Sequence, residues 1–245
     1  SMMTHYLRVK YETIEEFPYP YQEWSIHPLA RSVALQRELD TPAGRDLLAR
    51  IPVRVGSAIN DRSADVYVLS FSSEVFGTLY RSRSTDLLLP FNSSVIPDQD
   101  FGRIGYEDIA RRLGHAPDFS AEDWRFMQTE FTCHGPLDLQ QLENDVTAMF
   151  ETLRGRTVIV LMLNTRVGGQ SWVLDAFAKI NAVVRPLVAR YGYLSIDLAD
   201  FVRTVADLDS PDDVGVHFSR AVYRRLAEQV EALCCSPARQ LPVPA

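Results

Sequence analysis

The stretch Thr157-Val158-Ile159-Val160-Leu161-Met162-Leu163 decides the fold class. An uncharged run rich in β-branched residues predicts a strand that is buried on both faces, as in a parallel sheet. The pattern then predicts a helix over 172–191 that ends at Gly192, followed by a second strand over 193–198. Strand, helix and strand at this spacing require a crossover between parallel strands, so the sequence predicts an α/β protein.

The flanking sequence extends this pattern in both directions. A strand is predicted over 65–71, an amphipathic helix over 137–153, and a final helix over 218–233. We therefore predict a three-layer α/β/α domain over 61–235, flavodoxin-like in arrangement, with a parallel sheet of about five strands.

Residues on either side of this domain are predicted to be appendages. Residues 1–60 form an N-terminal extension, and the proline-rich tail over 236–245 is expected to be disordered. Within the extension, helical spacing over 28–50 is interrupted at Asp40-Thr41-Pro42, which indicates a stop, a new N-cap and a proline at the first helical position.

The middle of the chain gives weaker signals. A helix is predicted from Ser73 through Tyr80, a short strand or loop over 87–91, a helix over 106–113 that ends at Gly114, and a strand over 125–131.

The composition is that of a globular protein with an acidic balance. Of 245 residues, 46% are hydrophobic and 23% are charged, and 32 acidic against 25 basic side chains give a formal net charge of -7. This balance argues against a nucleic-acid partner. The apolar runs are far shorter than the roughly 20 residues that span a bilayer, so we expect no membrane partner and a cytoplasmic location.

The three cysteines, Cys133, Cys234 and Cys235, suggest neither a disulfide framework nor a zinc site. Neighbouring residues of a strand point to opposite faces, so Cys133 and His134 are not expected to act together. We expect Cys133 to be a buried structural thiol.

Two further stretches look like ligand loops but lack the required spacing. The segment Gly168-Gly169-Gln170 has no lysine of a phosphate loop and indicates a turn that leads into a helix. An acidic run lacks the alternating ligands of a calcium loop and indicates a solvated loop; it consists of Asp207, Asp209, Asp212 and Asp213. We predict no cofactor and no bound metal.

Chemistry is expected where the predicted parallel strands end, because ligands of open α/β sheets bind beyond the carboxyl ends of the strands. The polar residues that follow these ends are Ser70, Ser72, Ser73 and Glu74 after the first strand, Asn164 and Thr165 after the second, and Asp197 at the third. His217 lies between a polar loop and a helix, a position that suits a general base. Asp212 or Asp213 is expected to orient its ring.

Residues 157–230 resemble the C-terminal half of the SGNH/GDSL hydrolase superfamily. The resemblance consists of Asn181 in the helix, Tyr191-Gly192, Ile196-Asp197-Leu198, Asp213 before His217, and Tyr223 with Leu226-Ala227 in the final helix. In that family a serine after the first strand is the nucleophile of a catalytic triad. The resemblance implies Ser72 as nucleophile, with Ser73 as its rival, His217 as base and Asp213 as the residue that orients the base.

The chain departs from the family pattern at three places. Ser70 and Phe71 stand where the family has Gly and Asp, three residues separate Asp213 from His217 in place of two, and no Gly-x-Asn-Asp motif is present. Gly102 or Gly105 is then expected to supply an oxyanion amide.

These expectations define one leading function and one rival. The leading function is a serine esterase or acyltransferase that acts on a small acylated metabolite or a glycan acyl group, with Ser73, Glu74, Gly105 and Asn164 as substrate-binding residues. The rival is a non-hydrolytic protein of a biosynthetic pathway that uses the same cleft for binding or other chemistry. A small-molecule substrate is expected in either case, and a protein partner is left open.

Overall fold

A computed structural model describes residues 29–51, 59, 64–92, 101–113, 119–136 and 138–234. They form an α/β protein with one parallel and one antiparallel sheet. The described residues divide into two compact units, of which the first holds 64–70 and 155–234 and the second holds the others. The predicted extension over 1–60 is thus described only in part, and the tail over 236–245 lies outside the described residues.

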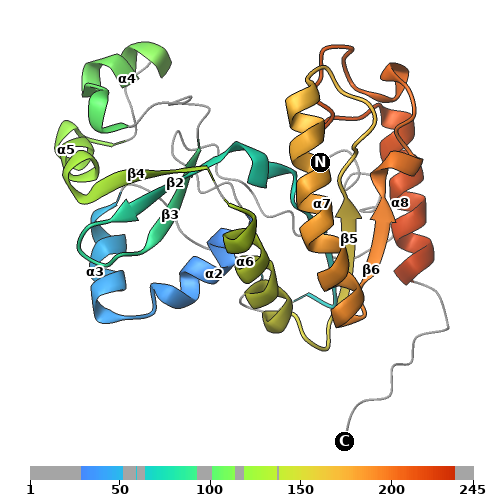
Figure 1. The fold of residues 1–245 in the computed structure, drawn as a ribbon, viewed down its shortest axis with the longest axis horizontal. Helices are drawn as coiled ribbons and strands as arrows, with labels where there is room; N and C mark the ends of the chain where they lie inside the picture. The colour runs from blue at the N-terminus through green and yellow to red at the C-terminus, as the bar shows by residue number, and fades with distance from the viewer. Residues whose placement is uncertain are drawn as a thin grey trace, which may run out of the picture. The chain divides into compact units, whose positions relative to one another are not determined.

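The first unit is built on a parallel sheet. Strands β1 (Val66–Ser70), β5 (Thr157–Met162) and β6 (Leu194–Asp197) lie in the order β1-β5-β6 (Figure 1). All pairings are parallel, with Ser70 opposite Leu161 and Met162 opposite Asp197. The three strands therefore end at the same edge of the sheet.

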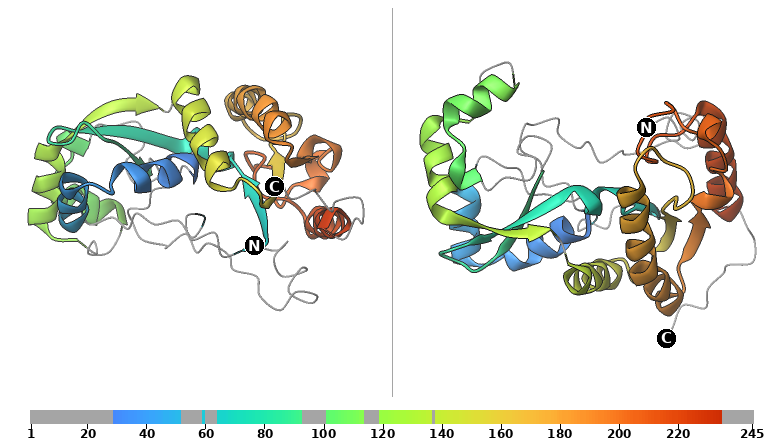
Figure 2. Two further views of the ribbon diagram at one scale, coloured as in Figure 1. Left: turned by 90° about the horizontal axis from the view of Figure 1, so that it is seen from below. Right: turned by 45° about the horizontal axis from the view of Figure 1, so that its top comes forward.

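Two helices lie on opposite sides of this sheet (Figure 2). Helix α7 (Ser171–Tyr191) connects β5 to β6, and Gly192 ends it in the left-handed conformation with a φ of 67°. Helix α8 (Arg220–Cys234) covers the other face in one apolar cluster; the cluster includes Ile159, Leu161, Ile196, Val222, Leu226 and Val230. The predicted crossover between parallel strands is confirmed.

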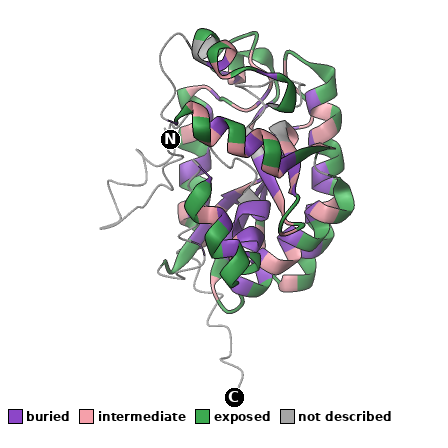
Figure 3. Ribbon diagram, turned by 90° about the vertical axis from the view of Figure 1, so that its left-hand side faces the viewer, coloured by how far each residue is buried: buried purple, intermediate pink, exposed green. Residues whose placement is uncertain are grey.

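The second unit holds an antiparallel sheet in the order β3-β2-β4. Its strands are β2 (Gly77–Ser82), β3 (Leu88–Asn92) and β4 (Phe131–Pro136). Its helices are α2 (Leu29–Glu38), α3 (Pro42–Arg50), α4 (Tyr106–Leu113), α5 (Ala121–Glu130) and α6 (Leu139–Thr152). Buried and exposed residues alternate along α5 and α6, whereas residues 30–35 of α2 are all buried; Figure 3 colours the chain by burial.

A buried ion pair joins two of these helices. Nη1 of Arg31 on α2 lies 2.8 Å from Oδ1 of Asp145 on α6, and each side chain is 2% exposed. Gln141 also donates to Oδ1 of Asp145, and Arg31 forms a second ion pair with Glu38. Oδ2 of Asp145 is buried without a hydrogen-bond partner.

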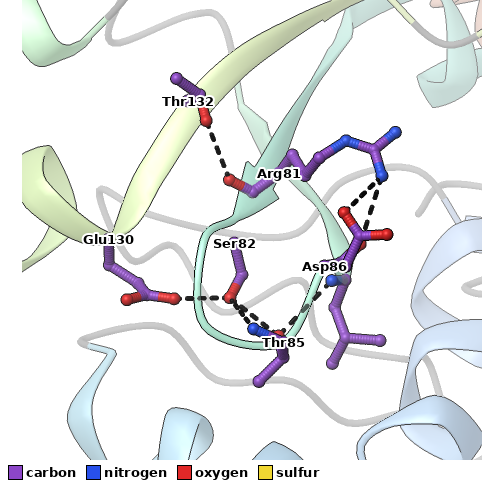
Figure 4. Close-up of polar contacts among 7 residues, drawn as sticks. Arg81, Ser82, Thr85, Asp86, Glu130 and Thr132 are labelled. Carbon is purple, nitrogen blue, oxygen red and sulfur yellow. Dashed lines mark hydrogen bonds and ion pairs between the residues drawn. The ribbon is translucent and has the colours of Figure 1, made fainter.

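The turn between β2 and β3 is held by an ion pair of Arg81 with Asp86 and by hydrogen bonds of Thr85 to Ser82 (Figure 4). The carboxylate of Glu130 connects this turn to the end of α5. It accepts hydrogen bonds from the hydroxyls of Ser82 (2.5 Å) and Ser84 (2.6 Å) and from the backbone amide of Ser84 (3.0 Å). The backbone amide of Arg83 donates to the carbonyl of Glu130 at 2.8 Å. The junction of α5 and β4 thereby anchors the hairpin.

Several predicted elements are confirmed. The break near Asp40-Thr41-Pro42 separates α2 from α3, and the Thr41 hydroxyl accepts from the amide of Gly44 at 3.0 Å as an N-cap. The helices predicted over 106–113, 137–153, 172–191 and 218–233 correspond to α4, α6, α7 and α8. Gly114, predicted to end α4, lies outside the described residues.

Two predictions for the second unit are wrong. A helix was predicted from Ser73 through Tyr80. The chain instead forms a short 3₁₀ helix, η1 (Ser72–Phe76), which is followed directly by strand β2. Leu79 and Tyr80 are buried between β3 and β4, so tertiary pairing overrides the local helical spacing. The strand predicted over 125–131 is helix α5, which starts with a reciprocal capping box between Ser120 and Asp123.

The predicted parallel sheet of about five strands has three strands among the described residues. Residues 71–154, predicted to continue that sheet, belong to the second unit. Over the described ranges, no helix is long and apolar enough to cross a membrane.

Candidate functional site

A short hairpin-like pairing positions His217 in the first unit. Leu208 and Phe218 form an antiparallel bridge. The amide of Asp209 donates to the carbonyl of His217 at 3.1 Å, and the amide of Ser219 donates to the carbonyl of Asp207 at 2.8 Å. These bonds fix the backbone of His217 three residues before the start of α8.

Asp213 holds the ring of His217. Oδ2 of Asp213 lies 2.7 Å from Nδ1 of His217. Oδ1 of the same carboxylate accepts from the backbone amides of Gly215 (2.7 Å), Val216 (2.8 Å) and His217 (3.1 Å). The sequence left Asp212 and Asp213 as alternatives, and Asp213 is the one that contacts the ring.

The two side chains differ in exposure: the carboxylate that orients the ring is shielded, and the imidazole is open to solvent. Asp213 is 10% exposed, whereas His217 is 69% exposed. Since Nδ1 faces Asp213, Nε2 is the ring nitrogen that can take a proton from a substrate or a nucleophile.

The carboxylate of Asp213 is stabilised in its charged form. Burial by itself raises its pKa, but the hydrogen bonds from His217, Val216 and Gly215 outweigh burial and lower the pKa below the ordinary value. Asp213 is therefore ionised at neutral pH and keeps the Nδ1 hydrogen of His217 in place.

Asn164 follows β5 at the same edge of the sheet. Its side chain is 1% exposed, and both its amide oxygen and its amide nitrogen bond to backbone atoms. The structure therefore places Asn164, predicted to bind substrate, inside the loop that leads to α7. Asp197 at the end of β6 also has local partners, since it accepts from the amide of Ala199 and pairs with Arg185.

The serines and Glu74 belong to the second unit, apart from Ser70. Ser70 ends β1, and Ser72 starts η1 two residues later. Oγ of Ser73 is buried without a hydrogen-bond partner. Glu74 is 3% exposed, and its Oε1 accepts from the amide of Ala30 at 3.0 Å at the start of α2. Ser72, Ser73 and Glu74 are therefore described apart from the Asp213–His217 dyad, which lies in the first unit.

The predicted oxyanion glycines lie next to α4 and α5. The carbonyl of Gly105 accepts from the amides of Asp108 and Ile109 at the start of α4, and the carbonyl of Gly102 accepts from Gln128 of α5.

The prediction that Cys133 is buried is wrong. Cys133 and its neighbour His134 are both exposed on β4, an edge strand with a register shift opposite Leu79 and Tyr80. Cys234 is partly buried, and Cys235 lies outside the described residues. Among the residues described, no group of three or more His, Cys, Asp or Glu side chains is arranged to hold a metal ion.

One exposed aromatic residue at this edge of the sheet was not singled out from the sequence. Trp172 in the first turn of α7 is 55% exposed, and its Nε1 donates to Oε1 of Gln170 at 2.7 Å. The sequence does contain a signal for this exposure. Val173 and Phe177 mark the buried face of α7, and Trp172 lies outside that face.

Comparison with known proteins finds no matching family model, no matching curated protein and no matching solved structure. The function of this chain is therefore inferred from the geometry and chemistry of the site itself.

Proposed function

We propose that this protein is a divergent SGNH-like serine esterase or acyltransferase. The observation that carries the proposal is the pairing of Nδ1 of His217 with Oδ2 of Asp213 at 2.7 Å, with Oδ1 occupied by three backbone amides. This arrangement leaves Nε2 of His217 as a base. The proposal includes a three-layer α/β/α core with about five parallel strands, of which β1, β5 and β6 are three.

Ser72 is the proposed nucleophile, because it follows the end of β1 by two residues. Its Oγ attacks the acyl carbonyl carbon while Nε2 of His217 takes the hydroxyl proton. The proton then passes to the leaving alkoxide as the ester bond breaks, which leaves an acyl-serine. Water or an acceptor hydroxyl loses its proton to His217 and attacks this ester. His217 then returns the proton to Oγ of Ser72 as the acyl–serine bond breaks, which releases the acyl product and regenerates both residues.

Trp172 is the proposed contact for the group that carries the acyl ester. Its indole is exposed and is held by Gln170, so it presents a fixed apolar face at the edge where the parallel strands end. Aromatic faces of this kind pack against apolar surfaces, including the C–H face of a sugar ring, at low entropic cost. This contact favours a small acylated metabolite or a glycan acyl group as substrate.

A fluorophosphonate probe tests the nucleophile, because only an activated serine reacts with it. We expect labelling of the unmodified protein, and loss of labelling in Ser72→Ala and in His217→Ala with unchanged melting temperatures. Ser73→Ala separates the two serines: labelling retained in Ser73→Ala and lost in Ser72→Ala supports Ser72. Labelling that persists in Ser72→Ala overturns the assignment of the nucleophile.

A non-hydrolytic function is the alternative, and the absence of a Gly-x-Asn-Asp motif together with Phe71 before Ser72 favours it. Without a complete oxyanion site the dyad would act on a bound hydroxyl without forming an acyl-serine. Absent labelling and absent hydrolysis of p-nitrophenyl acetate by the folded protein would select this alternative.

A further inference from the structure

The loop between β5 and α7 is closed by the side chain of Asn164. Its Oδ1 accepts from the amides of Arg166 (3.0 Å) and Val167 (3.3 Å), and its Nδ2 donates to the carbonyl of Val167 (2.5 Å). The side chain is 1% exposed, so water does not compete for these bonds.

This loop is bonded to the turn that contains Asp213. The amide of Gly169 donates to the carbonyl of Asp213 at 2.7 Å. Nδ2 of Asn164 also reaches the carbonyl of Gly215 at 3.5 Å. The loop therefore holds the turn at both Asp213 and Gly215.

Glycines allow the two backbones to approach this closely. A Cβ at Gly168 would lie 2.7 Å from the carbonyl oxygen of Val214, and one at Gly215 would lie 2.9 Å from that of Val167. Gly215 also has a φ of +100°, which side chains rarely adopt. The predicted role of Gly168-Gly169 as a turn into α7 thus includes close packing against the Asp213 turn.

We propose that Asn164 is a positioning residue for the Asp213–His217 dyad. Its path of action is short: Asn164 fixes the loop, the loop fixes Gly215, and the amides of Gly215 and Val216 fix Oδ1 of Asp213. Oδ2 is then aimed at Nδ1 of His217. The catalytic consequence rests on the proposed function, but the geometric one does not.

The test reads the His217 ring directly in nitrogen NMR spectra of the free protein. The chain has five histidines, so a His217→Ala spectrum assigns the signal. In the unmodified protein we expect the Nδ1–H tautomer, because the partner of one ring nitrogen sets the position of the hydrogen. In Asn164→Ala we expect a shift toward the Nε2–H tautomer, and hydrolysis of p-nitrophenyl acetate reduced at least tenfold in kcat.

Asn181→Ala is the matched control. Asn181 is also a buried asparagine next to the end of β5, but its Oδ1 and Nδ2 bond only to the backbone of Leu163, at 2.9 and 2.8 Å. We expect this variant to lose melting temperature while the His217 tautomer stays that of the unmodified protein.

Two further variants test the same proposal if Asn164→Ala does not fold. Asn164→Asp keeps the oxygen and removes the donor to Val167 and Gly215, and Gly215→Ala strains the same contact from the other side. An unmodified His217 tautomer in any folded Asn164 variant, or the same tautomer shift in Asn181→Ala, overturns the proposal. A tautomer shift in a protein without esterase activity overturns only the proposed function.

Discussion

Oδ2 of Asp213 lies 2.7 Å from Nδ1 of His217, while Oδ1 of the same carboxylate receives three backbone amides. Both oxygens of the carboxylate are therefore engaged, and the carboxylate has little freedom to rotate away from the ring. The backbone amides of the segment 213–217 therefore orient the carboxylate directly.

Asp213→Asn is expected to reduce esterase activity by about 10²–10⁴, because the amide no longer fixes the imidazole in the required tautomer. The loss in His217→Ala is expected to be at least as large, since that change removes the base itself. The two kcat values for p-nitrophenyl acetate hydrolysis check this order. Activity within tenfold of the unmodified protein in His217→Ala would contradict a hydrolytic role for the dyad.

Glu130→Gln is expected to destabilise the second unit by about 2 kcal/mol. All three bonds from Ser82 and Ser84 end on one oxygen, Oε1, and an amide oxygen in its place lacks the negative charge that strengthens them. Burial by itself raises the pKa of Glu130. The hydrogen bonds from Ser82 and Ser84 and the charge of Arg50 lower the pKa by more than burial raises it, so it lies below the ordinary value. The stability that the charged Glu130 contributes is fully present when the pH is above the ordinary carboxylate pKa. It is lost as the pH falls through the lowered pKa of the folded protein.

Urea unfolding at pH 7 and at pH 3 measures this contribution. Glu122→Gln on the exposed side of the same helix is the control and is expected to change the unfolding free energy by less than about 0.5 kcal/mol. A Glu130→Gln protein as stable as the control at pH 7 would show that the carboxylate does not anchor the hairpin.

Some parts of the fold and of the site are determined by neighbouring residues and could be predicted from the sequence. Other parts depend on contacts with residues far along the chain. The buried strand β5, the Gly192 cap and the Asp213–His217 segment follow from adjacent residues and were predicted. Strand β2 was not, because its Leu79 and Tyr80 have helical spacing and become a strand only between β3 and β4.

The role of Asn164 depends on the same kind of distant contact. Its position after a strand suggested a ligand-facing amide, and only the packing of a turn 51 residues away shows that the amide is enclosed by backbone. Cys133 is exposed for the related reason that β4 is an edge strand, which the local sequence does not reveal.

Trp172→Ala is expected to raise KM for an acetylated sugar about tenfold with little change in kcat, because the side chain contacts substrate away from the reacting bond. Trp172→Phe keeps an aromatic face and is expected to retain most of the affinity. Val205→Ala, which removes another exposed apolar side chain of the same unit (50% exposed), is the control and should leave both constants unchanged. A fall in kcat with unchanged KM in Trp172→Ala would contradict a binding role.

The buried pair of Arg31 and Asp145 is expected to make stability depend on pH in the opposite sense from Glu130. Burial raises the pKa of Asp145 to about 6, against the lowering effects of Arg31 and Gln141. The folded protein therefore binds this proton more tightly than the unfolded chain does, and the associated stability is fully present below about pH 4 and lost as the pH rises through 6. The change in unfolding free energy over this pH window is on the order of 3 kcal/mol.

Unfolding free energies measured from pH 4 to pH 7 test this prediction. The proteins compared are the unmodified protein, Asp145→Asn and the exposed control Glu143→Gln. The downward slope should persist in Glu143→Gln and disappear in Asp145→Asn, and an unchanged slope in Asp145→Asn would assign the titration to another group.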